Sequence, residues 1–392
     1  MIYKLFISFI ILHCWGLSNI IKINLITTND IHGVIASQDA TFMNPQYPPT
    51  IVGAAGLSKY VDELRDKAYD NDEGVLILDG GNFFQGNPLG IADRGRTMIE
   101  WMNRIGYDAM VPGSYDFISG TDNLNSLEIL ANFPFLFSNI ECKDCPLDIE
   151  NFRPYIIKDF NGVKVGILGL VNSQISEIVL SENLMGTSAL FEVQAMRNWV
   201  PLMKSEGAEI VIVLSSSGVP WDREEEYDEF VTKVKKGEID ENNISLNALE
   251  MAYFAQDVDF IVAGGNSKGY WLPWYDSNSH TYVMQGYGNG TEFSHIKLLI
   301  DEKTHLFIGY ETVVDGRASQ TLLSDDFTVN HTDKEWIDKK LNDAIISYNF
   351  NGSLGLKQST STKILDSDQW DFPNLDHEES IEIVTWNCEF FP

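Results

Sequence analysis

Short apolar runs alternate with longer mixed segments along most of the chain. Such runs are typical of strands buried on both faces, because apolar side chains then contact the layers above and below. The runs cover residues 23–27, 75–78, 135–139, 163–171, 210–214 and 260–263.

The segments between these runs are amphipathic. In residues 57–68, apolar side chains recur at Leu57, Val61 and Leu64, which is the spacing of one helix face, and residues 193–203 show a similar pattern. Strands alternating with helices predict parallel or mixed sheets covered by helices. Antiparallel strands are expected after them, with a hairpin turn at 301–303; they cover residues 281–285, 295–300 and 306–314.

The later chain carries weaker patterns. Residues 222–241 are rich in charge and predict a solvated insertion. A helix is expected near 333–348, followed by a polar linker that ends at residue 368 and a tail, 369–392, with room for one β-strand at 380–389.

The net charge of the chain limits the kinds of molecule that it is expected to bind. The chain has 392 residues, 44% of them hydrophobic, and 27 Lys and Arg face 57 Asp and Glu, for a net charge of −30. A surface this acidic repels phosphate backbones and anionic headgroups, so we expect neither nucleic acid nor a membrane surface as partner. The same field opposes nucleotide substrates unless local cations reverse it.

The N-terminus has the pattern of a secretory signal. A lone Lys4 precedes an apolar stretch, and small residues lead to a cleavage point near Ser18, so residues 1–18 are predicted to be a signal peptide. The alternatives are an uncleaved anchor and a buried first strand. We expect a secreted chain whose mature part does not insert into a membrane. Sequons for N-glycosylation fit this expectation and occur at Asn243, Asn289, Asn330 and Asn351.

Cys142 and Cys145 form a Cys-Lys-Asp-Cys motif. In an exported protein this spacing favours a short disulfide, because no second Cys or His pair accompanies it as a metal knuckle would require. A redox-active pair is the other interpretation.

Asp30 and His32 lie two residues apart behind the first apolar run, and Gly33 follows them. A carboxylate and a neutral imidazole leaving a strand on one side can bind one cation, and glycine permits the sharp turn beside it. In sheets of this type, further ligands are expected in loops after the other strands. Those loops cover residues 79–86, 113–117, 214–218 and 264–269.

The spacing and glycine frames of these five motifs resemble the 5′-nucleotidase and UDP-sugar hydrolase branch of the calcineurin-like metallophosphoesterases. The resemblance covers roughly residues 20–315 and implies a metallophosphoesterase domain at 19–315, built as a four-layer α/β/β/α sandwich with two mixed sheets. It also implies two divalent cations that share a bridging Asp, and a catalytic His oriented by an Asp. The family's C-terminal substrate domain is not expected here, and residues 316–368 are predicted to be a helical segment and linker.

Only the first motif keeps the family's ligands, Asp30 and His32. The resemblance implies that five of seven ligand positions are substituted; they are Asn82, Ser114, Ser216, Asn266 and Lys268. The catalytic His position is Tyr115, and the position of its orienting Asp is Ile118, so no catalytic residue is expected.

The substitutions have physical consequences. Asn82 is neutral where a carboxylate would join two cations. An ammonium at Lys268 repels a divalent metal and could itself neutralise Asp30 in a buried ion pair, which leaves open whether Lys268 takes the place of the cation. We therefore expect no cofactor, or at most one weakly held divalent cation. A structural interpretation stands beside the functional one: Asp30 and His32 hydrogen-bond their loop, Asp79 fixes a turn, and Asp116 is solvated or caps a helix.

The sequence thus predicts a secreted 5′-nucleotidase-like protein that is catalytically inactive and acts by binding or interaction with a protein or small molecule. One alternative is a weak, one-metal hydrolase of nucleotides or other phosphate esters. The other is a protein that binds nucleotides or sugars without turnover. Aromatic residues are expected to form a lid on the domain; they are Tyr270, Trp271, Trp274 and Tyr275.

Overall fold

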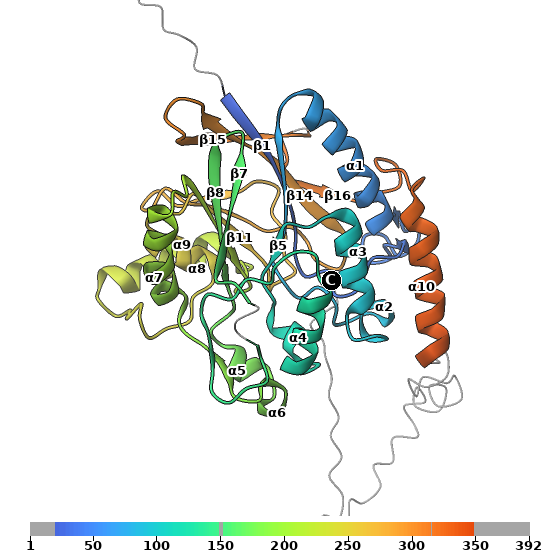
Figure 1. Ribbon diagram of the computed structural model, residues 1–392, viewed down its shortest axis with the longest axis horizontal. Helices are drawn as coiled ribbons and strands as arrows, with labels where there is room; N and C mark the ends of the chain where they lie inside the picture. The colour runs from blue at the N-terminus through green and yellow to red at the C-terminus, as the bar shows by residue number, and fades with distance from the viewer. Residues whose placement is uncertain (1–19, 149–151, 315, 349–392) are drawn as a thin grey trace, which may run out of the picture.

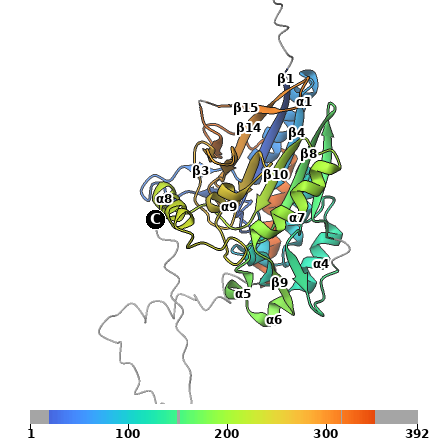
Figure 2. The ribbon, with the colours of Figure 1, turned by 90° about the vertical axis from the view of Figure 1, so that its left-hand side faces the viewer.

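Two six-stranded sheets lie face to face with helices on their outer sides, as the computed structural model shows for residues 20–148, 152–314 and 316–348 (Figures 1 and 2). The predicted four-layer α/β/β/α sandwich is confirmed. The expected signal peptide, the linker after residue 348 and the tail lie outside the described residues.

The first sheet is built around β1 (Ile20–Thr28). β1 pairs in parallel with β4 on one side and antiparallel with β14 on the other. The strands follow the order β15 (Phe307–Thr312), β14 (Glu292–Asp301), β1, β4 (Gly74–Asp79) and β5 (Ala109–Met110), and β16 (Ser319–Thr321) also pairs with β14.

The second sheet has a parallel centre. Its strands follow the order β12 (Trp274–Tyr275), β13 (Tyr282–Met284), β11 (Phe260–Ala263), β10 (Ile210–Ser215), β8 (Val163–Leu170) and β7 (Tyr155–Phe160). The antiparallel strand expected at 281–285 is confirmed only in part, because β13 pairs antiparallel with the two-residue β12 but in parallel with β11. The predicted β14–β15 hairpin is present.

Helices cover both outer faces. On the first sheet lie α1 (Ala54–Asp70), α2 (Pro88–Ile91), α3 (Arg96–Ile105), α4 (Thr121–Leu130) and α10 (Thr332–Tyr348), which packs on α1 and α2. On the second lie α7 (Glu192–Ser205), α8 (Arg223–Lys235) and α9 (Ala248–Phe254). Shorter elements are α5 (Ile175–Ile178), α6 (Ser181–Leu184), the 3₁₀ turn η1 (Ser114–Phe117), and the two-stranded pairs β2 (Gln38–Asp39) with β3 (Thr50–Ile51) and β6 (Ile140–Cys142) with β9 (Thr187–Ala189).

Strand β10 shows why the apolar runs are continuous. Ile210, Ile212 and Leu214 belong to the core between the two sheets, whereas Val211 and Val213 belong to the core beneath α7 and α9. Because side chains alternate between faces and both faces are covered, each position must be apolar.

One predicted segment differs from expectation, and another, the charge-rich one, is largely exposed as predicted. Residues 135–139 form only isolated bridges, Met110 with Phe135 and Leu136 with Arg153, because the chain there crosses between the sheets rather than extending along one. The charge-rich segment 222–241 contains helix α8, which is mostly exposed and buries Phe230.

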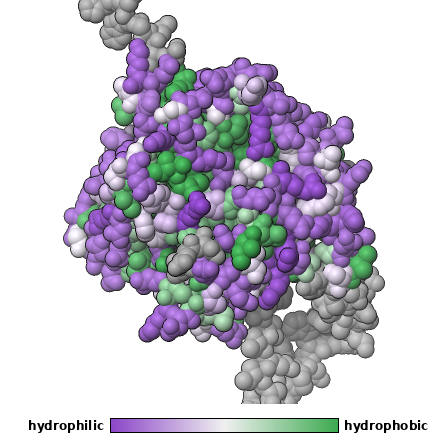
Figure 3. Space-filling view, viewed as in Figure 1, coloured by the Kyte–Doolittle hydropathy of each residue, from purple (hydrophilic) through white to green (hydrophobic). Residues whose placement is uncertain are grey.

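The surface is largely hydrophilic on the face in Figure 3, with separate apolar patches rather than one continuous band. None of the helices among the described residues combines the length and apolar character needed to cross a bilayer.

Candidate functional site

The carboxyl ends of β1, β4, β10 and β11 lie at one edge of the sandwich, and the loops that follow them converge there. The backbone N–H of Asp30 donates to the carbonyl oxygen of Gly81 at 2.8 Å, and that of Gly264 donates to Ser215 at 2.8 Å. The loops therefore meet as the sequence predicts for sheets of this type.

The carboxylate of Asp30 is 1% exposed and receives N–H groups on both oxygens. Oδ1 accepts from Nδ2 of Asn82 at 2.8 Å and from the backbone of Gly265 at 3.0 Å. Oδ2 accepts from Nδ2 of Asn29 at 2.8 Å and from the same Gly265 N–H at 3.1 Å. The buried negative charge is thus stabilised by neutral dipoles of the protein.

The orientation of the Asn82 amide follows from its second contact. Its Oδ1 accepts the backbone N–H of Tyr115 at 3.0 Å, so Nδ2 must face Asp30. A Cβ at Gly113 would lie 2.1 Å from Oδ1 of Asn82, which explains the glycine in this motif. The family motif implies a carboxylate at this position that bridges two cations, whereas this chain has the Asn82 amide, which donates a hydrogen bond to Asp30.

His32 keeps the orientation of a ligand. Its Nδ1 lies 2.9 Å from the carbonyl oxygen of Gln85, so Nδ1 carries the proton and Nε2 is the free acceptor. Nε2 lies 4.0 Å from Oδ1 of Asp30, and the Tyr115 ring meets the imidazole edge-on with centroids 5.7 Å apart. Asp30 (φ 49°), His32 (φ 53°) and Asn82 (φ 58°) all have left-handed backbone, which these residue types tolerate better than most.

Lys268 does not take the place of a cation beside Asp30. Nζ of Lys268 donates to the carbonyl oxygen of Trp221 at 3.0 Å and lies 4.5 Å from the centroid of the Trp221 ring and 5.5 Å from that of Tyr270. The ammonium gains a carbonyl and two aromatic faces there, whereas Asp30 already has its donors.

The other substituted positions are also tied to local structure. Ser216 is buried, and its Oγ accepts from the backbone of Asn172 at 3.0 Å. Asn266 donates to the carbonyl oxygen of Val219 at 2.9 Å. Ser114 is buried at the start of η1, and Ile118 is 40% exposed at its end.

Two buried carboxylates hold the loops in place. Oδ1 of Asp79 accepts the N–H of Gly81 at 2.9 Å, and Oδ2 accepts the hydroxyl of Thr28 at 2.6 Å, so Asp79 fixes the turn as predicted. Burial, together with the nearby carboxylates of Asp116 and Asp30, raises the pKa of Asp79 well above its usual value.

Asp116 is fully buried and therefore not solvated, but it takes the capping role that was the other expectation, because its carboxylate accepts the backbone N–H of Gly113, the N-cap of η1. Its carboxylate accepts backbone N–H groups from Gly113 and Asn82, each at 2.8 Å, and from Phe83 at 3.0 Å, which joins η1 to the loop after β4. Burial raises the pKa of Asp116 to about 7. In the sequence, only the glycines of the two loops that Asp116 connects signal this role.

The donor set does not fit the dinuclear metal centre that the fold implies. Asp30 shares its oxygens with three N–H donor groups, Lys268 points elsewhere, and the side chains at Ser114 and Ser216 are neutral and weak ligands. Among the described residues, no three His, Cys, Asp or Glu side chains are grouped so that they could hold a metal ion.

No family model matches the chain. Among curated proteins, the snake venom 5′-nucleotidase of Crotalus adamanteus is 26% identical over 323 residues, which is 81% of this chain and 51% of that protein. The 5′-nucleotidase of Diplobatis ommata is 27% identical over 209 residues, 52% of this chain and 34% of that protein. The chain is similar in sequence to 5′-nucleotidases over most of its length. It spans between about a third and a half of the length of these two relatives.

Solved structures agree with this fold. The 5′-nucleotidase precursor of Thermus thermophilus aligns with a TM-score of 0.61 at 20% identity, over 83% of this chain and 58% of that one. The calcineurin-like phosphoesterase YfkN of Bacillus subtilis aligns with a TM-score of 0.57 at 20% identity, over 85% of this chain and 98% of that one. The chain therefore has the metallophosphoesterase fold of these structures around an altered site.

The remaining predicted residues lie around the site or away from it. The expected aromatic lid is divided: Tyr270 stacks under Arg223 at 4.2 Å, Trp271 under Arg317 at 4.2 Å, and Trp274–Tyr275 form the edge strand β12. A disulfide joins Cys142 to Cys145.

The predicted sequons differ in access. Asn243 and Asn330 are exposed, whereas Asn289 is partly buried and its N–H donates to the carbonyl oxygen of Asp30 at 2.7 Å. Asn351 lies outside the described residues. Sequence reasoning missed Asn29 and Gly265 as donors to Asp30, although both lie within motifs it singled out.

Proposed function

We propose that this chain is a secreted 5′-nucleotidase-family protein that does not carry out two-metal phosphoester hydrolysis and acts by binding or interaction. One contact carries the proposal: the Asn82 amide donates to Asp30 at 2.8 Å. A carboxylate in that place would bind two cations, whereas this donor already uses the Asp30 oxygen that a cation would need. The proposed cofactor state is no metal, or one divalent cation held weakly by Asp30 and His32.

Export is supported by two independent features. The Cys142–Cys145 disulfide is of the kind that persists in oxidising compartments, and one curated relative is named as a venom protein. The sequons at the exposed Asn243 and Asn330 are accessible to glycosylation, so the proposal includes a glycosylated, extracellular chain whose mature part does not insert into a membrane.

A one-metal hydrolase is the second candidate. It is favoured by His32, whose Nε2 is free as an acceptor and lies 4.0 Å from Oδ1 of Asp30. A binding protein without turnover, specific for nucleotides or sugars, is the third; a ligand of that kind would raise the melting temperature by mass action.

Metal content and phosphatase activity distinguish these candidates. The full chain, the Asp30→Ala variant and the exposed control Asp66→Ala are dialysed, loaded with Mn²⁺ or Zn²⁺, and assayed with AMP, UDP-glucose and an aryl phosphate. We expect substoichiometric metal and no turnover in all three proteins. Turnover that is lost in Asp30→Ala and kept in Asp66→Ala would overturn the proposal in favour of the one-metal hydrolase.

A further inference from the structure

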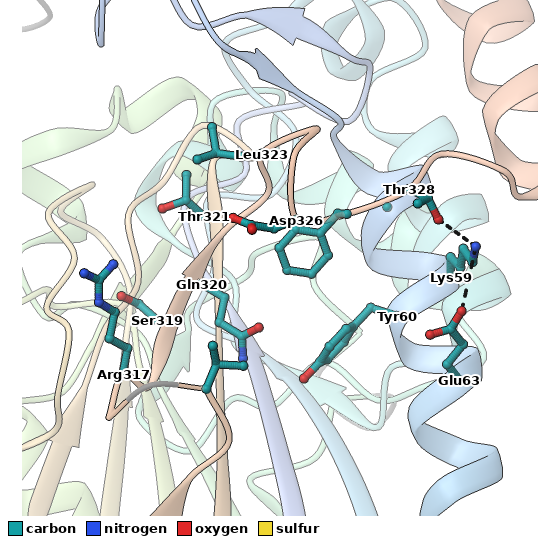
Figure 4. A pocket seen from close by; sticks show the side chains of 13 residues that line it. Lys59, Tyr60, Glu63, Arg317, Ser319, Gln320, Thr321, Leu323, Asp326 and Thr328 are labelled. Carbon is teal, nitrogen blue, oxygen red and sulfur yellow. Dashed lines mark hydrogen bonds and ion pairs between the residues drawn. The ribbon is translucent and has the colours of Figure 1, made fainter.

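A second cavity lies away from the Asp30 site, between α1, β16 and the segment 323–328 (Figure 4). Its volume is about 740 Å³, within the range of roughly 300–1,000 Å³ that is usual for small-molecule sites. Among the described residues, its lining shares none with the five motif loops. The cavity is thus a separate feature of the first sheet's outer layer.

Two aromatic side chains, Tyr60 and Phe327, line the cavity. Tyr60 and Phe327 meet edge-on with centroids 5.8 Å apart, and both pack on the buried ring of Phe293, at 5.0 and 5.7 Å. Figure 4 shows the Tyr60 ring between Gln320 on one side of the cavity and the Lys59–Glu63 pair on the other. Flat apolar faces of this kind pack against the C–H faces of a ligand ring.

The Tyr60 ring is held by a chain of hydrogen bonds. Asn24 donates through Nδ2 to the carbonyl oxygen of Gly74 at 3.1 Å, so its Oδ1 accepts from Nε2 of His295 at 3.1 Å. Nδ1 of His295 is then the acceptor for the Tyr60 hydroxyl at 2.7 Å. The aromatic wall is therefore preorganised, which lowers the entropic cost of binding.

Charge at the cavity is balanced. Lys59 and Arg317 line it together with Glu63 and Asp326. Nζ of Lys59 donates to Oγ1 of Thr328 at 2.6 Å and lies 3.7 Å from Glu63, and Arg317 lies 4.2 Å over the Trp271 ring. A phosphate or an organic cation meets as much repulsion as attraction here, and the net charge of −30 further disfavours anions. The lining favours an uncharged ligand.

Polar groups along β16 complete the wall. Ser319, Gln320 and Thr321 line the cavity and offer both donors and acceptors. Ser319 is 3% exposed, and its Oγ has no hydrogen-bond partner among the described residues. A buried hydroxyl without a partner is costly, and a ligand hydroxyl would satisfy it after a rotamer change.

We propose that this cavity binds a neutral saccharide. The sugar ring packs on Tyr60 and Phe327, and its hydroxyls exchange hydrogen bonds with Ser319, Gln320 and the carboxylates of Glu63 and Asp326. A neutral polyhydroxylated ring is the ligand class that combines apolar C–H faces with donors and acceptors and carries no charge.

The test uses saturation-transfer NMR with maltotriose, cellotriose, chitotriose and mannotriose as probes. The full chain is produced without glycosylation, so that no glycan of its own competes. The variants are Phe327→Ala and Asp326→Ala, and the control is Tyr69→Ala, an 87% exposed tyrosine on the same helix as Tyr60. AMP and choline serve as anionic and cationic competitors.

We expect at least one trisaccharide to bind, with affinity reduced roughly three- to tenfold in Phe327→Ala and unchanged in Tyr69→Ala. Asp326→Ala removes an exposed side chain, so it tests the site if Phe327→Ala fails to fold. Absence of binding by all four saccharides, binding that neither cavity variant weakens, or displacement by AMP or choline would overturn the proposal. None of these outcomes depends on whether the Asp30 site hydrolyses phosphate esters.

Discussion

Nδ2 of Asn82 lies 2.8 Å from Oδ1 of Asp30, and the other half of the Asn82 amide accepts the Tyr115 N–H at 3.0 Å. One neutral side chain therefore balances a buried carboxylate and fixes the loop beside it. This contact takes the place that a shared metal ligand has in the family motif, and it makes the site stable without a cation.

We expect Asn82→Asp to destabilise the metal-free protein. The new carboxylate would lie beside Asp30, with both groups buried, and removing a compensating partner from a buried charge costs roughly 3–5 kcal/mol. Added Mn²⁺ or Ca²⁺ should recover part of the loss, because two carboxylates can share a divalent cation. Thermal unfolding with and without metal measures both effects.

Asn82→Ala is the matched control for that variant. It removes the same hydrogen bonds without adding charge, so its cost should be about 1–3 kcal/mol and should not respond to metal. Equal metal responses in the two variants would contradict the role assigned to the Asn82 amide.

Lys268→Met should be nearly neutral for stability. The ammonium contacts Trp221 and Tyr270 at the surface rather than Asp30, and a cation–π contact at an exposed site contributes about 0.5–1 kcal/mol. Asp30→Asn should cost more, because it places an amide against the N–H donors of Asn82, Asn29 and Gly265. Urea unfolding of both variants checks the order, and an equal cost would indicate that Lys268 pairs with Asp30 after all.

Sequence periodicity located the strands whose two faces are both covered. The apolar run at 210–214 matches β10, because Val211 and Ile212 point to opposite faces of the sheet and each packs in a separate hydrophobic core. The run at 260–263 coincides with β11. Periodicity does not encode the pairing partner, so the parallel alignment of β13 with β11 could not be predicted from it.

The sequence showed which residue types occupy the ligand positions of the altered site, but it did not show which contacts those residues make. The motif loops identified Asn82 and Lys268 as substituted ligand positions. The sequence does not show where the long lysine side chain points, because this depends on whether folding brings the Asp30 carboxylate or the Trp221 carbonyl and ring within its reach. Trp221 reaches Lys268 from a segment 47 residues earlier in the chain, and no local pattern signals that contact. The cap that Asp116 places on Gly113 is a local contact and was expected, whereas its contacts with Asn82 and Phe83, more than thirty residues away, could not be predicted for the same reason.

Asp116→Ala should be among the most damaging single substitutions near the site. It leaves the backbone N–H groups of Gly113, Asn82 and Phe83 without an acceptor, and each buried unsatisfied group costs about 1–3 kcal/mol. Asp66→Ala, at an exposed position on α1, should change stability by less than about 0.5 kcal/mol. Denaturant midpoints measure both, and a small effect of Asp116→Ala would show that the two loops are held by other contacts.

His295 should make the stability of the fold sensitive to acid. Burial and the neighbouring Lys297 ammonium lower the pKa of this imidazole to about 3, against an ordinary value of 6.5, while Glu73 acts in the opposite direction. Because the folded pKa is depressed, the unfolded chain binds a proton that the folded chain does not between these two values. The His295 contribution is therefore fully present above pH 6.5 and is lost as the pH falls from 6.5 towards 3.

His295→Gln isolates this contribution. The amide can keep hydrogen bonds to Tyr60 and Asn24 but does not titrate, so the variant should be less stable at neutral pH and should lose stability less steeply on acidification. The difference in slope between the two proteins should approach about 1.4 kcal/mol per pH unit below pH 6, the value for one proton. Urea unfolding at several pH values measures it. Parallel curves for the two proteins would mean that His295 is already protonated in the folded chain, and the Tyr60 hydroxyl could then not donate to it.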